Sequence, residues 1–312
     1  MTFDRYPRSI VRRILRGRPQ PGGHTRVFLN LREGLDRLGV EYRVNDYRNA
    51  RRRPTELVCI IGKPHMLDVM RWRNPIVFGA AVHSHPIDDP LLLGRLNVKR
   101  VLVPGEWMRK MCEPYYGNRV TAWPVGIDTD LWAPDPGVMK DIDILLYDKV
   151  RWQHGRYETE LIQPILDDIR RRGLCVSVLR YGEYRESEYH RLIQRAKAMV
   201  FLCEHETQGI AYQQALSADV PLFAWDRGGL WQDPSYYPSK VQFEPVSSVP
   251  YWDDRCGMTF VDIAAFRTHV DTFWDAVQSN RYTPRSYALD NLTLEHCARQ
   301  YVNIVRSEEE SC

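Results

Sequence analysis

The sequence has no long hydrophobic run, few cysteines and almost no net charge. No apolar stretch among its 312 residues approaches the roughly 20 residues that a membrane-spanning helix needs. The first residues also lack the apolar stretch of a secretory signal, so we expect a cytoplasmic protein. The seven cysteines stand singly with no Cys-x-x-Cys pair, which argues against a zinc site and for reduced thiols. A net charge of +3 argues against a nucleic-acid partner.

The charge is nevertheless uneven along the chain. Residues 1–20 contain six arginines, from Arg5 to Arg18, against the single acid Asp4. Apolar residues such as Ile10 and Leu15 lie between them at helix-like spacing. Two interpretations stay open: peripheral contact with an anionic surface such as the inner membrane face or an acidic partner, or a solvated basic segment beside the fold.

Short runs rich in Val and Ile alternate with longer amphipathic segments, which is typical of parallel strands joined by crossover helices. The Pro-rich stretch 133–139 interrupts this alternation, and the pattern then restarts. We therefore predict an α/β protein with two Rossmann-like, doubly wound domains, residues 1–135 and 136–312, whose C-terminal helices can pack back on the first domain. The predicted strands are 41–45, 56–62, 75–83, 99–104 and 119–124, then 142–147, 175–181, 199–203 and 221–225.

The strongest candidate site is the run from Cys203 to Ala211, between a predicted strand and a predicted helix. Gly209 would let the backbone approach a phosphate, and the free N–H groups of the helix's first turn favour its negative charge. The carboxylate of Glu206 can accept hydrogen bonds from sugar hydroxyls. The pattern suits a ligand with both parts, although an acidic N-cap on an ordinary helix explains it as well.

Several motifs, taken in order along the chain, resemble the retaining GT-B glycosyltransferases of family 4. The matching stretches cover roughly residues 21–230 and are Pro21-Gly22-Gly23 ahead of a helix, 103–107, 125–134, Glu206-x-x-Gly209, 215–221 and 226–229. The resemblance implies the GT-B fold, in which two Rossmann-like domains face a central cleft. Gly22 and Gly23 correspond to the family's acceptor-side loop.

The resemblance also implies roles for the run after the predicted strand 199–203. Glu206 would bond the ring hydroxyls of the donor sugar, and the backbone amides near Gly209 and Ile210 would hold the diphosphate. Thr207 and Gln208 belong to the same donor-binding loop.

Further residues match the family with changes. Gln214 stands where the family has a second acid that binds the ribose, so nucleotide preference is expected to differ. Lys149 and Arg151 follow the first strand of the second domain, where the family has a basic pair for the diphosphate; surface charges at a strand end are the alternative. His83 corresponds to a histidine that faces the transferred sugar, with His85 as the substitute.

These inferences lead us to expect a metal-independent, cofactor-free transferase that moves a hexose-like group from a nucleoside diphosphate sugar to an unknown acceptor, with retention. A sugar-nucleotide epimerase or hydrolase and a non-catalytic sugar-nucleotide-binding protein are the alternatives, because fold does not decide reaction type. The motif 226–229 either completes the floor of the site or forms a plain turn.

Overall fold

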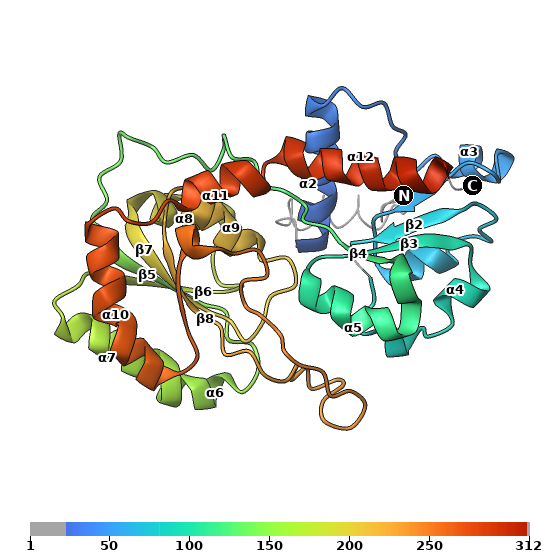
Figure 1. Cartoon of the computed structure of the whole chain (residues 1–312). Helices are drawn as coiled ribbons and strands as arrows, with labels where there is room; N and C mark the ends of the chain where they lie inside the picture. The colour runs from blue at the N-terminus through green and yellow to red at the C-terminus, as the bar shows by residue number, and fades with distance from the viewer. Residues whose placement is uncertain (1–22, 81, 311–312) are drawn as a thin grey trace, which may run out of the picture. The chain divides into compact units, whose positions relative to one another are not determined.

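The computed structural model describes residues 23–80 and 82–310, which form two compact units (Figure 1). The first unit contains the described residues up to Gly126 together with the segment that begins at Leu294. The second unit is Ile127–Thr293. Within the described ranges, every helix is too short or too polar to span a bilayer.

The first unit is a parallel sheet of four strands in the order β1-β2-β3-β4. Its strands are β1 (Val58–Ile60), β2 (Ile76–Gly79), β3 (Val98–Val103) and β4 (Val120–Ala122). Its helices are α2 (Gly23–Arg37), α3 (Tyr47–Arg52), η1 (Pro64–Asp68), η2 (Pro86–Asp88), α4 (Leu92–Arg95), α5 (Glu106–Tyr116), η3 (Gly117–Arg119) and α12 (Leu294–Glu310).

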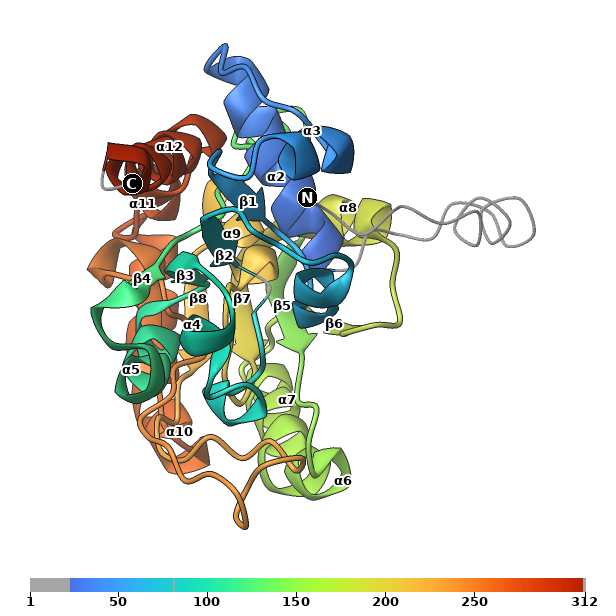
Figure 2. The same ribbon diagram turned by 90° about the vertical axis from the view of Figure 1, so that its right-hand side faces the viewer.

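Helix α12 belongs to the first unit although it ends the described chain. It packs against α2 (Figure 1 and Figure 2). At this contact a Cβ on Gly34 would lie 2.5 Å from the carbonyl oxygen of Leu294. It also covers Trp123, whose indole Nε1 donates to the carbonyl of Cys297 at 2.9 Å. The last helix therefore completes a core that starts near residue 27, so this unit is discontinuous in sequence.

The second unit is a parallel sheet of five strands in the order β6-β5-β7-β8-β9. Its strands are β5 (Ile142–Asp148), β6 (Val176–Arg180), β7 (Ala196–Leu202), β8 (Leu222–Trp225) and β9 (Gly257–Phe260). Its helical segments are α6 (His154–Tyr157), the π-helical η4 (Glu158–Ile162), α7 (Gln163–Arg171), α8 (Glu186–Arg195), α9 (Ile210–Ser217), η5 (Asp254–Cys256), α10 (Ile263–Gln278) and α11 (Pro284–Asn291).

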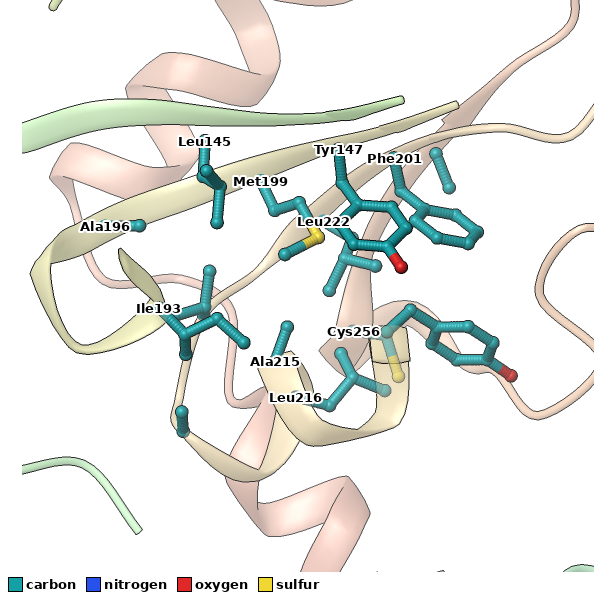
Figure 3. Packing of buried hydrophobic residues seen from close by; sticks show 14 of the residues in the cluster. Leu145, Tyr147, Ile193, Ala196, Met199, Phe201, Ala215, Leu216, Leu222 and Cys256 are labelled. Carbon is teal, nitrogen blue, oxygen red and sulfur yellow. The ribbon is translucent and has the colours of Figure 1, made fainter. Parts of the chain in front are cut away.

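Both faces of this second sheet are buried. Leu145 and Tyr147 of β5 point into a cluster closed by residues of α8 and α9, among them Ile193 and Ala215 (Figure 3). The alternate residues, such as Ile144, enter a second cluster with α7 and α10. Strands buried on both faces read as continuous apolar runs, which is why the pattern 142–147 predicted a strand.

The α/β class and the two parallel sheets agree with the prediction, but three details differ. The predicted strand 41–45 is irregular. Its Tyr42 and Val44 side chains are exposed, so the apolar side of the segment is not buried against a core. Strand β9 was not predicted. The units divide after Gly126 instead of residue 135, because Trp132 packs in the core of the second unit and the N–H of Asp135 donates to Gln194.

Candidate functional site

The candidate site lies at the carboxyl ends of the second unit's strands. From β5 the chain moves to β6 on one side and then to β7 on the other, so β5 and β7 flank the point where strand order reverses. Ligands of doubly wound sheets bind in the crevice at such a point. The segments that follow β5, β7 and β8 (149–153, 203–209 and 226–231) are therefore the candidates for ligand binding.

Lys149 and Glu206 form a buried ion pair at this edge. Pairing of β5 with β7 brings their following residues together, and the N–H of Lys149 donates to the carbonyl of Leu202 at 2.7 Å. The side chains of the pair are only 12% and 10% exposed. Burial lowers the pKa of Lys149, but the neighbouring carboxylate of Glu206 more than offsets this, and the pKa stands above its ordinary value. The lysine therefore carries its charge inside the site.

Helix α9 begins beside this pair with a glycine in the left-handed region. Gly209 has φ +75° and is the N-cap residue, and a Cβ there would lie 1.9 Å from the Tyr212 ring. The acidic N-cap considered from the sequence is wrong, because the cap is Gly209 and no side chain of the described residues caps the helix. Ile210 is its first residue. The first-turn N–H groups are thus available to an anion.

Three glutamines surround the start of α9. Gln208 is 6% exposed, and neither of its amide atoms has a hydrogen-bond partner among the described residues. Gln213 donates through Nε2 to the carbonyl of Gln208 at 2.6 Å and so holds the turn. Gln214 is buried within α9, and Thr207 is half-buried in the preceding turn. A buried amide without a partner is a candidate contact for a ligand.

Glu204 and His205 also belong to the site, although no role was predicted for them. One carboxylate oxygen of Glu204 accepts the backbone N–H groups of Arg151 and Trp152 at 2.8 and 2.7 Å. The exposed Arg151 reaches His205 through its guanidinium. The run Glu204-His205-Glu206 after a predicted strand was visible in the sequence. Its partners lie more than 50 residues away, so the sequence did not reveal them.

The motif 226–229 does more than form a turn. The carboxylate of Asp226 accepts the hydroxyl of Ser247 at 3.0 Å and the N–H of Ser248 at 2.8 Å. The carbonyl of Ser247 in turn accepts the N–H of Glu206 at 2.9 Å. Asp226 therefore anchors a distant loop segment against the residue that pairs with Lys149.

The first unit places its two candidate histidines after β2. His85 is buried, and its Nδ1 accepts the N–H of Ile87 at 3.0 Å, so it caps η2. His83 lies 3.8 Å from Asp89, and its Nε2 is buried without a hydrogen-bond partner among the described residues. Burial lowers the pKa of His83 although Asp89 opposes this shift, and the lowered pKa favours a neutral imidazole. His83 thus retains a nitrogen for a ligand, whereas the Nδ1 of His85 is engaged within its own turn.

Two predicted features lie outside the described residues: Gly22 of the acceptor-side loop and the Arg-rich segment 1–20. Gly23 is the first residue of α2. A cavity of about 1310 Å³ in the first unit is lined by parts of α2, β1 and α12 and contains none of the predicted site residues.

One group of described side chains has the composition of a metal site. Asp148, His154 and Glu158 offer ligand atoms within 4.8 Å of one another. Asp148 is already engaged, because its carboxylate lies 2.8 Å from His154 Nε2 and 2.7 Å from the guanidinium of Arg180. The guanidinium of Arg180 already neutralises the negative charge of Asp148 that would otherwise attract a metal ion.

Comparison with known proteins supports the fold. No protein-family model matches the sequence, and the curated proteins give no match either. Among solved structures, the chain is similar to WaaG, a glycosyltransferase involved in lipopolysaccharide biosynthesis (14% identity, TM-score 0.51). The match covers 91% of this chain and 96% of WaaG. It is also similar to sucrose-phosphate synthase from Thermosynechococcus elongatus (12% identity, TM-score 0.52, covering 95% and 83%).

A third similar structure is S. aureus TarM in complex with fondaparinux, α-GlcNAc-glycerol and UDP (10% identity, TM-score 0.52, covering 89% of this chain and 58% of TarM). The chain likewise spans 57% of the chains in three further matching structures. The likenesses to WaaG, sucrose-phosphate synthase and TarM confirm the predicted GT-B fold.

Proposed function

We propose that this protein is a glycosyltransferase that moves a sugar from a nucleoside diphosphate sugar to an acceptor. The observation that carries the proposal is the buried Lys149–Glu206 pair beside the uncapped start of α9, at the strand-order reversal of the second sheet. A cation and free N–H groups suit a diphosphate, and a carboxylate suits sugar hydroxyls. The GT-B fold and the UDP bound to TarM agree with this chemistry.

The proposed mechanism is stabilisation of the leaving group. As the bond from the sugar to the diphosphate breaks, negative charge grows on the diphosphate. Lys149, Arg151 and the N–H groups at Gly209 and Ile210 would stabilise that charge more than the charge of the bound donor, and so accelerate the reaction. No side chain is needed as a covalent nucleophile, and we propose that the anomeric configuration is retained.

The remaining polar residues would orient the donor and acceptor. Glu206 would accept hydrogen bonds from sugar hydroxyls, and the buried amide of Gln208 would bond a polar atom of the donor. Gln214 would bond the ribose as a neutral group, which predicts weaker ribose binding than a carboxylate gives. His83 would act as a neutral hydrogen-bonding group for the sugar or the acceptor.

The proposal includes no metal requirement, because the charges at the site come from side chains and backbone N–H groups. Donor turnover is expected to be unchanged in EDTA. Loss of turnover in EDTA, restored by Mg²⁺ or Mn²⁺, would contradict this part and direct attention to Asp148, His154 and Glu158.

Calorimetry with UDP, GDP, ADP and dTDP, and with their common sugars, tests the proposal. One nucleotide is expected to bind the wild type, and Glu206→Ala and Lys149→Ala are expected to weaken it at least tenfold, while the exposed Arg156→Ala serves as a matched control. Turnover of the donor without any acceptor would favour a hydrolase or epimerase. Binding without turnover in an acceptor screen would favour the non-catalytic alternative, and no binding at all would overturn the proposal.

A further inference from the structure

His205 connects the three segments at the carboxyl edge of the second sheet, which follow β5, β7 and β8. It follows β7, is 4% exposed, and lies within reach of residues that follow β5 and β8. Its Nε2 is 3.3 Å from a guanidinium nitrogen of Arg151 and 3.2 Å from the indole nitrogen of Trp231. Guanidinium and indole groups are donors only, so Nε2 must be the acceptor, and it carries no proton.

Packing holds the ring in this orientation. The His205 ring lies 4.9 Å from the Trp152 ring at 33° and 6.5 Å from the Trp231 ring at 84°. The guanidinium of Arg151 lies 5.0 Å from the Trp152 ring. Because Glu204 binds the backbone N–H groups of Arg151 and Trp152, the main chain of this segment is held separately from the Arg151 side chain.

The charges around His205 keep it neutral. The cations that face it are Lys149 and Arg151 after β5 and Arg227 after β8, and the acids on its own segment are Glu204 and Glu206. Burial first, and then the three cations, lower the pKa of His205 to about 2. The imidazole therefore remains an acceptor throughout the pH range of ordinary assays.

We infer that His205 is a positioning residue for the donor diphosphate: as a hydrogen-bond acceptor it orients the Arg151 guanidinium and ties it to Trp231. This inference rests on the proposed function, because Arg151 is assigned there to the diphosphate. An exposed arginine has many rotamers, and an acceptor at 3.3 Å reduces the entropy that it would lose on binding a ligand. His205 itself does not contact the reacting atoms in this scheme.

Two substitutions separate the acceptor from the shape of the ring. His205→Phe keeps a flat ring between the tryptophans and removes the acceptor, while His205→Gln keeps an acceptor oxygen. Calorimetry would use UDP, GDP, ADP and dTDP, each beside its nucleoside. We expect His205→Phe to weaken the diphosphate that binds the wild type about tenfold and the matching nucleoside less than about twofold, because only the diphosphate meets Arg151. His205→Gln should stay within about threefold of the wild type.

A double-mutant cycle with Arg151→Ala gives the decisive reading. If His205 acts through Arg151, each single variant loses about tenfold and the double variant loses little more. The inference is overturned if folded His205→Phe binds like the wild type, if diphosphate and nucleoside weaken equally, or if the two losses multiply to about a hundredfold. Failure of the wild type to bind any of the four nucleotides would overturn the proposed function itself, and this inference with it.

Discussion

The two sheets share one architecture but differ in what stands at their carboxyl edges. In the second unit, Lys149, Glu204, His205 and Glu206 are largely buried and linked to one another or to backbone groups after neighbouring strands. In the first unit, the residues after β2 supply neutral histidines, of which His83 faces one carboxylate at 3.8 Å. Parallel strands bring their ends together in both units, but among the described residues only the second unit joins buried charges that follow two neighbouring strands, Lys149 after β5 and Glu206 after β7. The comparison shows that the segments after the strands, rather than the sheet itself, set the charge at each carboxyl edge.

Buried charges tolerate little change because a lone charge cannot be solvated where water is excluded. In the first unit, the feature chosen for comparison is the close packing of α12 on α2. Each prediction below alters one side of this contrast.

The largest effect is expected from splitting the buried ion pair. Lys149→Ala leaves the Glu206 carboxylate buried without its cation, and we expect the free energy of unfolding to fall by about 3 to 5 kcal/mol. Chemical denaturation followed by tryptophan fluorescence measures the loss. The control is Arg156→Ala, whose pair with Glu160 is more than half exposed and should leave the midpoint unchanged. Equal losses of unfolding free energy in Lys149→Ala and Arg156→Ala would show that the buried pair is no more important for stability than the exposed one.

A smaller loss is expected at the start of α9. Gly209→Ala places a Cβ 1.9 Å from the Tyr212 ring in a left-handed residue, so the free energy of unfolding should fall by about 3 kcal/mol. Gly228→Ala is the matched control, because its φ is also positive (+60°) but its Cβ would meet nothing within 4 Å; about 1 kcal/mol is expected there. Thermal unfolding compares the two. A Gly209→Ala protein no less stable than Gly228→Ala would show that Tyr212 moves freely.

In the first unit, the contact of α12 with α2 is the sensitive point. Gly34→Ala would press its Cβ against the Leu294 carbonyl and to within 2.8 Å of the Ala298 Cβ, at a cost of about 2 kcal/mol. Faster hydrogen exchange is expected in α12 while the second unit is unchanged. Gly94→Ala in α4, where a Cβ meets nothing within 4 Å, should leave exchange unaltered. Unchanged protection of α12 in Gly34→Ala would argue against this packing.

The smallest effect is a pH dependence from His205. Its pKa is about 2 in the folded protein against 6.5 ordinarily, so below pH 6.5 the unfolded chain binds a proton that the folded chain does not. Stability is therefore lost as pH falls, by about 1.4 kcal/mol between pH 7.5 and 5.5, and His205→Gln should remove this part. His83 and His85 also have lowered pKa values, but both proteins contain them. Their contribution therefore cancels when the two pH profiles are subtracted. Parallel pH profiles would mean that His205 takes up its proton in the folded state.

The sequence by itself determined the α/β class, most strands and the candidate loop from Cys203 to Ala211. These depend on local signals: apolar runs long enough for buried strands, helical periodicity and a glycine at a strand-to-helix turn. The predicted strand 41–45 failed because local β-propensity does not report whether a buried face exists to receive Tyr42 and Val44.

Only the tertiary structure decided which residues meet. Lys149 and Glu206 are 57 residues apart, and Arg151 and Glu204 are 53 apart, and each pair comes together because β5 and β7 are neighbours in the sheet. A local pattern reports which residues form a strand but not which strands become neighbours, because that depends on packing between distant segments. The same holds for Leu294–Glu310, whose apolar face is completed by α2 in the first unit. The arrangement of the candidate site therefore depends on long-range pairing, while its residue types were already visible in the chain.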